Sequence, residues 1–351
     1  MLQELSLSTF RNLENLRWQP SKGSHLLLGG NGAGKTSLLE AVYLLSTTRS
    51  FRTSRINDCC QHGSSSFSLE GEILGESRVR LETSWKLRSK VRRLNGSEVA
   101  LAKYLAAQPI VAWTHADADL LSGPPEPRRR FLDRGVMGTQ PTALDLFGRY
   151  RRVLAHKRHV LQQGPQDLEI WNEMLAPVAF EMTALRARYV TKLARSLEEV
   201  LQLCSFPFPA ITVHYRPSLN EVQSQEDVLA ALRALEGEEK RRQRPLLGPQ
   251  RDDLEVVWDD HSLRRVASQG ERKAIGLALA AAHGKVLEQG GVKPIYLLDD
   301  ADAELAKDTL EAVWKAFYGV EQVFASSNRP EVWDSIPFAK TWTLRLGQIS
   351  V

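Results

Sequence analysis

The spacing of apolar residues changes along the chain and divides it into segments of different character. Leu26-Leu27-Leu28 is a short apolar run that ends in a glycine cluster, and from Thr36 onward leucine and valine recur at helical spacing. This order predicts a strand, a loop and a helix in direct succession. Between residues 67 and 99 the period becomes two, and Asn95-Gly96 can form a tight hairpin turn because both positions tolerate positive φ. We therefore expect an α/β region followed by an antiparallel β-meander.

A helical segment follows and separates two stretches of α/β character. Prolines cluster after Leu121, and residues 131–203 are rich in Leu, Ala and Arg at helical spacing. The run Phe206-Pro207-Phe208-Pro209 closes this segment, and the charged stretch 236–244 is typical of a loop. The simplest organisation is an α/β head in two parts, at residues 1–115 and 206–351, with an all-helical arm domain inserted at 116–205.

Composition limits the classes of protein to consider. The chain has 351 residues, of which 42% are hydrophobic and 25% charged, which is ordinary for a globular protein of about two domains. The formal net charge of +4 is too small to indicate a nucleic-acid partner without a local basic patch. The cysteines at 59, 60 and 204 exclude a disulfide framework and lie in no metal-binding spacing. With no signal peptide pattern and no apolar span of about 20 residues, we expect a soluble cytoplasmic protein.

The glycine cluster matches a phosphate-binding loop. Residues 29–36, Gly29-Gly30-Asn31-Gly32-Ala33-Gly34-Lys35-Thr36, fit the pattern G-x-x-x-x-G-K-S/T. Glycines allow successive backbone N–H groups to converge on phosphate oxygens, and the following helix adds its positive N-terminus. Lys35 would reach the β- and γ-phosphates of ATP, the Thr36 hydroxyl would bind Mg²⁺, and Ser37 would complete the cofactor-binding segment. The alternative is a glycine-rich turn that precedes a helix by chance.

Two acidic residues follow a second apolar run. Ile295-Tyr296-Leu297-Leu298 precedes Asp299 and Asp300, which is the Walker B arrangement of a strand and its acidic end. Asp299 would hold Mg²⁺, directly or through water, and Asp300 would orient and deprotonate the attacking water. Aspartate has a shorter arm than glutamate at the second position, so turnover would be slow. The alternative is a helix N-cap after a buried strand.

A third element lies about thirty residues before these acids. Ser268-Gln269-Gly270-Glu271 opens a helix, and by itself it is an S-x-x-E capping box. Its place before the Walker B strand matches the signature helix of ABC-type ATPases, in which Ser268 and Gly270 would contact the γ-phosphate bound by a second subunit. ATP would then bring two copies of the chain together in a homodimer. The candidate catalytic residues are Lys35, Ser268 and Asp300.

Further motifs lie outside these three segments. Phe10-Arg11-Asn12 is similar to an F-R-N motif, residues 49–53 to S-x-R-T, residues 123–133 to G-x-P-x-x-R-R-x-F-L-D, and residues 247–254 to G-P-H-R-D-D-L. Together they resemble the RecF family of the SMC/ABC-type ATPase group over essentially the full length of the chain. The resemblance implies an ABC-type P-loop ATPase head with an antiparallel β-meander and an inserted all-helical domain. It also implies that Arg11 and Asn12 belong to the cofactor-binding site.

The resemblance implies a biological role as well. The RecF family acts in DNA replication and recombinational repair, supports RecA loading on single-stranded or gapped DNA with RecO and RecR, and takes part in SOS induction. We therefore expect ATP and Mg²⁺ as cofactors, and DNA, RecO and RecR as partners.

Basic residues concentrate in two places. Residues 78–93 contain seven Lys or Arg and one acid, and residues 128–158 contain nine and two. A basic strand face can track several phosphates, which gives sequence-independent and salt-sensitive binding. The alternative is a solvated edge strand whose charges discourage aggregation. We expect Lys86, Arg88, Lys90 and Arg92 to share one face of a strand about 20 Å long. The candidate DNA-binding residues are Arg52, Lys86, Arg88, Lys90, Arg92, Arg129, Arg151 and Arg152.

These observations favour an ATP-switched DNA clamp that is a weak DNA-stimulated ATPase. Ala306 stands where an acid is expected after Glu304-Leu305, and Ser326-Ser327-Asn328 lacks a switch histidine. Both departures leave a second hypothesis open, a DNA-binding scaffold that holds ATP with negligible turnover. A transporter-type nucleotide-binding subunit is a third hypothesis, and the basic helical segment argues against it.

Overall fold

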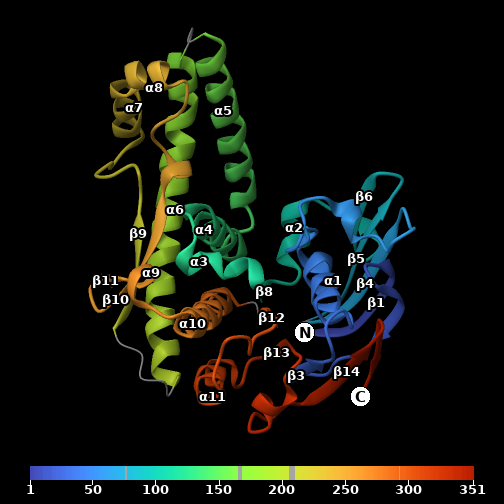
Figure 1. Cartoon of the computed structure of the whole chain (residues 1–351). Helices are drawn as coiled ribbons and strands as arrows, with labels where there is room; N and C mark the ends of the chain where they lie inside the picture. The colour runs from blue at the N-terminus through green and yellow to red at the C-terminus, as the bar shows by residue number, and fades with distance from the viewer. Residues whose placement is uncertain (76, 165–167, 205–209, 292) are drawn as a thin grey trace. The chain divides into compact units, whose positions relative to one another are not determined.

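The chain folds into two compact units, each with its own secondary structure (Figure 1). The structure is a computed structural model, and it describes all residues except 76, 165–167, 205–209 and 292, and the side chain of residue 116. One unit, which we call the head, comprises Met1–Ser122, Ser196–Phe208 and Ala267–Val351. The other, which we call the arm, comprises Gly123–Arg195 and Pro209–Val266.

The first sheet of the head is mostly parallel. Its strand order is β15-β14-β3-β13-β12-β8, and only the pair β14-β15 is antiparallel. Every position of β12 and β13 is buried, as expected for parallel strands that are covered on both faces. The strands are β3 (Gly23–Leu28), β8 (Ile110–Trp113), β12 (Ile295–Leu298), β13 (Gln322–Ser327), β14 (Lys340–Arg345) and β15 (Gln348–Ser350).

The second sheet of the head is antiparallel, with the order β2-β1-β4-β5-β6-β7. The hairpin predicted at Asn95-Gly96 is confirmed, because both residues have positive φ and Leu94 pairs with Ser97 across the turn. The strands are β1 (Leu2–Phe10), β2 (Leu13–Trp18), β4 (Phe67–Leu74), β5 (Arg78–Lys86), β6 (Ser89–Leu94) and β7 (Ser97–Glu98).

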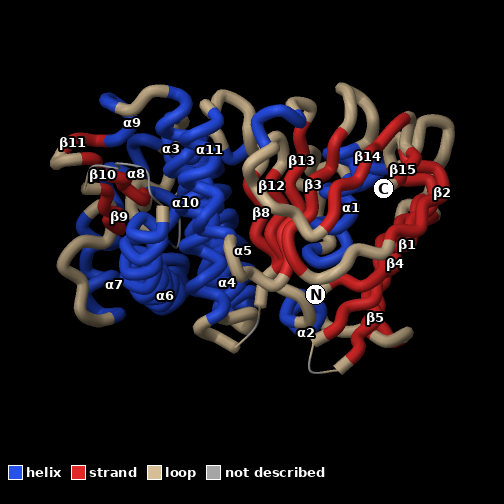
Figure 2. Tube along the Cα trace, turned by 90° about the horizontal axis from the view of Figure 1, so that it is seen from below, coloured by secondary structure: helices blue, strands red, loops and turns tan. Residues whose placement is uncertain are grey.

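Helix α1 (Lys35–Thr47) lies between these two sheets (Figure 2). Its leucines at 38, 39, 44 and 45 are buried in one cluster with Leu5 of the antiparallel sheet and Phe324 of the parallel sheet. The helix that follows the glycine loop is therefore also the centre of the head's core. The other head helices are α2 (Leu101–Ala106), α3 (Asp119–Ser122), α10 (Gln269–Glu288) and α11 (Lys307–Trp314).

The arm combines helices with a small antiparallel sheet of order β11-β10-β9. His156 of α5 stacks on Trp171 of α6 with ring centroids 5.1 Å apart, which joins the two long helices. Among the helices of the described residues, none has both the length and the apolar character that a membrane crossing requires. The elements are α4 (Pro125–Thr139), α5 (Ala143–Gln163), α6 (Leu168–Leu203, its last turns counted with the head), β9 (Ile211–Arg216), α7 (Gln225–Ala234), α8 (Glu236–Arg242), β10 (Asp253–Trp258), β11 (His261–Ser262) and α9 (Leu263–Val266).

The arm is larger than the predicted insertion at 116–205. It also takes in residues 210–266, because buried ion pairs tie that segment to the helices: Arg128 of α4 pairs with Asp253, and Arg186 of α6 pairs with Asp252. The arm is consequently not all-helical. The segment 206–209, where the sequence analysis ended the arm, lies outside the described residues.

The charged stretch 236–244 is not the predicted loop, because residues 236–242 form helix α8. Two ion pairs at helical spacing, Lys240 with Glu236 and Arg242 with Glu238, stabilise this helix. Glu239 of the same helix is fully buried. In this segment the helix is indicated by opposite charges four residues apart, and not by the spacing of apolar residues.

The predicted basic strand face is wrong. A turn at Leu87 and Arg88, both with positive φ, separates β5 from β6. Lys90 is opposite Trp85 in the pairing and Lys86 is opposite Ser89, so Lys86 and Lys90 lie on opposite faces of the sheet. The alternation of basic residues predicted one strand, but it continues across the turn of a hairpin.

Candidate nucleotide-binding site

The candidate site lies at the edge of the parallel sheet where the strands end. In the register of the sheet, Leu28 of β3 is beside Ser327 of β13, and Leu298 of β12 is beside Ala325. The glycine loop, Asp299 and Ser326 therefore meet at one edge, because parallel strands place their carboxyl ends together. The spacing of the motifs in the sequence gave no hint of which strands would be neighbours.

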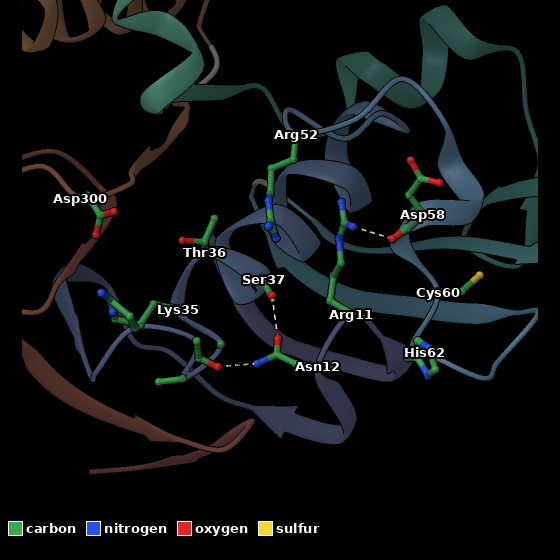
Figure 3. A pocket seen from close by; sticks show the side chains of 14 residues that line it. Arg11, Asn12, Lys35, Thr36, Ser37, Arg52, Asp58, Cys60, His62 and Asp300 are labelled. Atoms are coloured by element: carbon green, nitrogen blue, oxygen red, sulfur yellow. Dashed lines mark hydrogen bonds between the residues drawn. The ribbon is translucent and has the colours of Figure 1, made fainter.

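A pocket of about 580 Å³ opens at this edge (Figure 3). Residues 31–37 form its floor, and the side chains of Arg11, Asn12 and Arg52 line it together with Asp300. Figure 3 shows Asp300 near Lys35 and Thr36, whereas Cys60 and His62 lie at the opposite end. The structure thus brings the predicted loop, the Phe-Arg-Asn motif and the second Walker acid to one cavity.

The loop has the features of an anion site. Gly34, the N-cap of α1, has φ 112°, and no side chain caps the helix, so its first-turn N–H groups are available to an anion. Residues with a side chain rarely adopt this φ, and a Cβ at Gly34 would also lie 2.9 Å from the Leu13 side chain, so the position favours glycine. The Lys35 ammonium donates hydrogen bonds to the carbonyl oxygens of Gly29 (2.7 Å) and Gly30 (3.1 Å) and spans the loop.

Asn12 fixes the loop from outside. Its amide nitrogen donates to the Gly32 carbonyl (2.9 Å), and its amide oxygen accepts from the Ser37 hydroxyl (2.7 Å), as Figure 3 shows. The Asn12 side chain therefore connects the middle of the loop to the first turn of α1. In this way Asn12 can contribute to the site by holding the loop.

The Thr36 hydroxyl and the Asp299 carboxylate are in direct contact. Thr36 donates to Asp299 at 3.0 Å, and the Ser326 hydroxyl donates to the same carboxylate oxygen at 2.7 Å. Burial raises the pKa of Asp299, and these two hydrogen bonds oppose the rise. Sequence reasoning recorded Ser326 only as part of a segment without histidine, and missed this role.

The two oxygens fit a hard cation such as Mg²⁺. Within the described residues, no group of three or more His, Cys, Asp or Glu could hold a metal without further ligands. Mg²⁺ in proteins usually takes one or two side-chain oxygens and completes its shell with substrate phosphates and water. The pair Thr36 and Asp299 beside a phosphate-binding loop matches that chemistry.

Asp300 is held by its backbone while its carboxylate stays exposed. Its N–H donates to the Ser326 hydroxyl at 2.9 Å, and its carbonyl accepts from the Lys273 ammonium at 3.0 Å. Asp300 has φ 45°, an uncommon conformation for a residue other than glycine. Burial lowers the pKa of Lys273, and Glu304 and the neighbouring aspartates counteract this. Among the described residues, Asp300 forms its hydrogen bonds through its backbone, and its carboxylate faces the pocket.

A buried carboxylate, Glu40 of α1, organises the opposite wall. Arg11 donates to both of its oxygens, at 2.9 and 2.6 Å, and Arg52 lies 3.4 Å away. The Ser50 hydroxyl donates to it as well. Burial works against the charge of Arg11, but Glu40 outweighs it and raises the Arg11 pKa. The signal in the sequence was a single acid within the apolar pattern of residues 38–45.

Arg52, a candidate DNA contact in the sequence, lines this pocket, and its contact with DNA stays a prediction. The far end of the cavity also has three side chains that the sequence analysis did not single out, Asp58, Cys60 and His62. The Asp58 backbone carbonyl accepts from Arg11, and its carboxylate accepts from the Thr53 hydroxyl at 2.7 Å. These groups lie too far along the chain from the glycine loop for a local motif to include them.

The signature segment forms the predicted cap. Ser268 accepts from the Glu271 N–H and donates to its carboxylate, which is the capping box of α10. A Cβ at Gly270 would lie 3.0 Å from the Glu304 carbonyl. Among the described residues that line the pocket, neither Ser268 nor Gly270 is present. Ser268 is exposed and faces away from its own chain's core.

The remaining candidate DNA contacts have varied surroundings. Lys90 donates to the Thr48 carbonyl and Arg92 to the Val99 carbonyl, so both participate in the packing of the head. In the arm, Arg129 donates to the Asp252 carbonyl, whereas Arg151 and Arg152 are exposed on α5. Contact of these residues with DNA stays a prediction.

Known proteins resemble this chain in sequence. Residues 1–337 match the family model described as RecF/RecN/SMC N terminal domain. A DNA replication and repair protein RecF from Geobacter sulfurreducens is 31% identical, over 87% of this chain and 86% of the relative. The chain belongs to the RecF family. The RecF protein of Acidothermus cellulolyticus is 30% identical over 100% of this chain and 99% of its own.

Solved structures confirm the predicted fold class, an ABC-type ATPase head. A structure of the recombination mediator protein RecF with ATP has a TM-score of 0.88 at 24% identity, and the match covers 99% of this chain and 96% of that one. An Smc head bound to the C-winged helix domain of ScpA has a TM-score of 0.59 at 15% identity, over 99% and 96%. The fold is thus that of RecF and SMC heads, as the sequence motifs predicted.

Proposed function

We propose that this RecF-family chain binds ATP with Mg²⁺ and uses the nucleotide to control DNA binding in replication and recombinational repair. The observation that carries the proposal is the contact of Thr36 with Asp299 at the glycine loop, since it joins a phosphate site to a cation site. The names of the relatives support the biological context, because they are DNA replication and repair proteins.

In this proposal the loop N–H groups and Lys35 bind the phosphates, while Thr36 and Asp299 hold Mg²⁺. The bound cation would supply positive charge that neutralises the phosphate oxygens. Arg11 and Arg52 place further positive charge on the pocket wall, fixed by Glu40. Asp58 and His62 stand at the far end, where the nucleoside would lie.

The proposal includes an ATP-dependent homodimer. Ser268 and the first turn of α10 would complete the phosphate site of a second copy, which agrees with the exposure of Ser268 and Gln269 and with the absence of this segment from the described lining of its own pocket. By linkage, a nucleotide that binds the dimer better than the monomer shifts the chain toward the dimer.

Turnover would be slow and stimulated by DNA. Asp300 would accept a proton from the attacking water, and its backbone contacts with Ser326 and Lys273 would keep its carboxylate in place. An aspartate reaches less far than a glutamate, which favours a switch over a fast enzyme.

DNA, RecO and RecR are the proposed partners. One similar structure is of a RecF protein described in the RecFOR pathway, and the resemblance extends this to RecA loading on gapped DNA and to SOS induction. Both the head and the arm contain exposed basic residues that suit a sequence-independent contact.

Sedimentation tests the nucleotide-dependent dimer. Wild type, Ser268→Arg and a matched control, Ser97→Arg on the exposed edge strand β7, are compared with ATP, with ADP and without nucleotide. We expect a dimer only with ATP, in wild type and in the control but not in Ser268→Arg. A wild-type chain that stays monomeric with saturating ATP and Mg²⁺ would falsify the dimer mechanism.

A DNA-binding scaffold with negligible turnover is the second candidate. The observation that favours it is Ala306, the N-cap of α11, which offers no side-chain acid after Glu304. ATP hydrolysis is measured with and without DNA for wild type and Asp300→Asn. A lower rate in the variant supports the switch, whereas equal rates in both proteins support the scaffold.

A further inference from the structure

The arm contains a second pocket, of about 510 Å³. Three separate segments line it: Arg129 from α4, Arg158 and Gln162 from α5, and the residues that follow α8, which include Arg244 and Arg251. All of these segments belong to the arm itself. The pocket therefore collects four guanidinium groups that the sequence spreads over more than a hundred residues.

Most of this positive charge has no counter-ion. In the described part of the chain, the side chains of Arg158, Arg244 and Arg251 take part in no ion pair, and no Asp or Glu lines the pocket. Arg158 and Arg244 are exposed. Arg251 donates only a long hydrogen bond, 3.4 Å, to the Pro245 carbonyl. By contrast, Arg128 and Arg186 of the same unit are buried and paired with aspartates.

The walls of the pocket are built on buried polar contacts. Lys157, next to Arg158, pairs with Glu239 at 2.7 Å, and both side chains are completely buried. The other oxygen of Glu239 accepts from the Leu246 N–H at 2.8 Å, which fixes the segment that carries Arg244. These contacts hold the two segments without involving the side chains of Arg158 or Arg244.

A similar framework supports the other wall. The Tyr150 hydroxyl contacts the Gln250 side chain and accepts from the Gln250 N–H, and Arg186 donates to the Pro249 carbonyl at 2.7 Å. Arg129 donates to the Asp252 carbonyl at 3.1 Å. Burial and the nearby charge of Arg186 lower the pKa of Arg129, partly offset by Asp253. Positive charge is thus concentrated in the pocket, and a bound anion would reduce the repulsion between the guanidinium groups.

The lining chemistry favours phosphate groups over bases. Guanidinium groups bind phosphate oxygens through two parallel hydrogen bonds, and the amide of Gln162 adds a neutral donor. Among the described lining residues no aromatic side chain is present, so a base would find no stacking surface. Arginines from several segments suit consecutive phosphates of one strand better than a single small anion.

We propose that this arm pocket binds the phosphodiester backbone of DNA through Arg129, Arg158, Arg244 and Arg251. The inference rests on the proposed function, since it assigns a surface to the DNA binding proposed above. It differs from the sequence-based prediction in its residues, because Arg158, Arg244 and Arg251 were not among the candidates and only Arg129 is shared. The contact is independent of base sequence.

Fluorescence anisotropy with labelled oligo(dT) and with a labelled duplex tests the proposal on the full chain. The variant Arg158→Ala/Arg244→Ala removes two exposed guanidinium groups from the pocket. The control Arg188→Ala/Arg195→Ala removes two exposed arginines of α6 that do not line it, so the net charge changes equally. We expect the pocket variant to lose about tenfold or more in DNA affinity at low salt, and the control to lose about twofold or less.

Two further measurements separate a phosphate contact from a structural effect. The slope of log affinity against log salt should fall by about 1.4 for the single strand when two phosphate contacts are lost. Arg158→Lys/Arg244→Lys should bind DNA more tightly than the alanine variant, because the charges remain, and less tightly than wild type, because lysine cannot make the two parallel hydrogen bonds. Thermal unfolding and ATP-dependent dimerisation should be the same in wild type and in all three altered proteins.

The outcomes distinguish this proposal from the proposed function. If wild type binds no DNA in any nucleotide state, the proposed function fails and the pocket assignment with it. If wild type binds DNA and the pocket variant binds equally well, or no worse than the control, only the pocket assignment is overturned. Calorimetry with pyrophosphate on a Lys35→Ala background gives a last outcome. If the protein binds pyrophosphate saturably, and the pocket variant loses this binding while its DNA affinity is unchanged, the pocket belongs to a small phosphorylated ligand. That result would overturn the proposal.

Discussion

The head pocket and the arm pocket use opposite means to attract an anion. In the head, one continuous loop offers backbone N–H groups and a single ammonium, and the two arginines of the wall, Arg11 and Arg52, are paired with Glu40. In the arm, guanidinium groups from three segments converge, and those of Arg158, Arg244 and Arg251 take part in no ion pair with the residues that the structure describes. The first arrangement is encoded locally and selects the shape of a phosphate chain. The second depends on tertiary structure and selects charge, which suits a long polyanion.

The largest effect is expected where the arm framework is buried. Arg186 donates to Asp133 (2.7 Å), Asp252 (2.8 Å) and the Pro249 carbonyl, and it is almost fully buried. Arg186→Met would leave two carboxylates without their cation and should lower the free energy of unfolding by about 3–5 kcal/mol. Urea unfolding measures this. Arg188→Met, an exposed neighbour on the same helix, is the control and should change it little; equal effects of both would show that the ion pairs are not what holds the arm.

In the head, Lys35→Ala should reduce ATP affinity by about a hundredfold, because a charge-assisted hydrogen bond to phosphate is lost. Titration with a fluorescent ATP analogue measures it. DNA binding without nucleotide should persist, since the arm pocket has its own cations. A parallel loss of nucleotide-free DNA binding would contradict the separation of the two sites.

A smaller effect is expected from Asn12→Ala, which removes the two hydrogen bonds that connect Gly32 with Ser37. A looser loop should bind ATP about five- to tenfold less tightly, which corresponds to the lower half of the range of about 0.5–1.5 kcal/mol for each lost bond. The same titration serves, with Asn15→Ala of β2 as the control. Unchanged affinity would mean that the loop keeps its shape without outside support.

The smallest effect concerns acid stability of the head. His25 is fully buried, its Nε2 lies 2.8 Å from the Ser21 carbonyl, and its Nδ1 accepts from the Trp342 indole, which requires the neutral ring. Burial lowers the pKa of His25, so the unfolded chain takes up a proton that the folded ring refuses. The stability that the neutral ring contributes is fully present above the ordinary histidine pKa and is lost as the pH falls below it. The free energy of unfolding then decreases by at most about 1.4 kcal/mol per pH unit.

Unfolding followed at a series of pH values tests this. His25→Gln should flatten the loss of stability below about pH 6.5, whereas His159→Gln, at an exposed position of the arm, should not. A wild-type curve that is already flat in this range would refute the assignment of a neutral ring.

The parts of the fold that local patterns specify were predictable. Strand β3, the glycine loop and α1 follow one another in the sequence, and the Asn95-Gly96 turn and the Ser268 cap are each specified within four residues. The contact between Thr36 and Asp299 needed the order of strands in the sheet, which periodicity does not give. Family resemblance filled that gap.

The failures have specific causes. Residues 85–92 keep their alternation through a two-residue turn, so a period of two could not distinguish one strand from a hairpin. The role of Ser326 depends on β13 lying beside β12. The arm pocket depends on the buried pair of Lys157 with Glu239, two residues that look like ordinary surface charges in the sequence.

Arg251 and Asp252 are consecutive residues with opposite surroundings. The arginine is exposed at the arm pocket, whereas the aspartate is fully buried and accepts from Arg186, Tyr215 and the Ser218 N–H. Inserting one residue just before them would move Arg251 into the buried place against Arg186, and deleting one would move Asp252 into the exposed place among the arginines. The number of residues between Pro249 and β10 is therefore constrained more tightly than their chemical character, and changes of length there should be tolerated far less than point substitutions at Arg251.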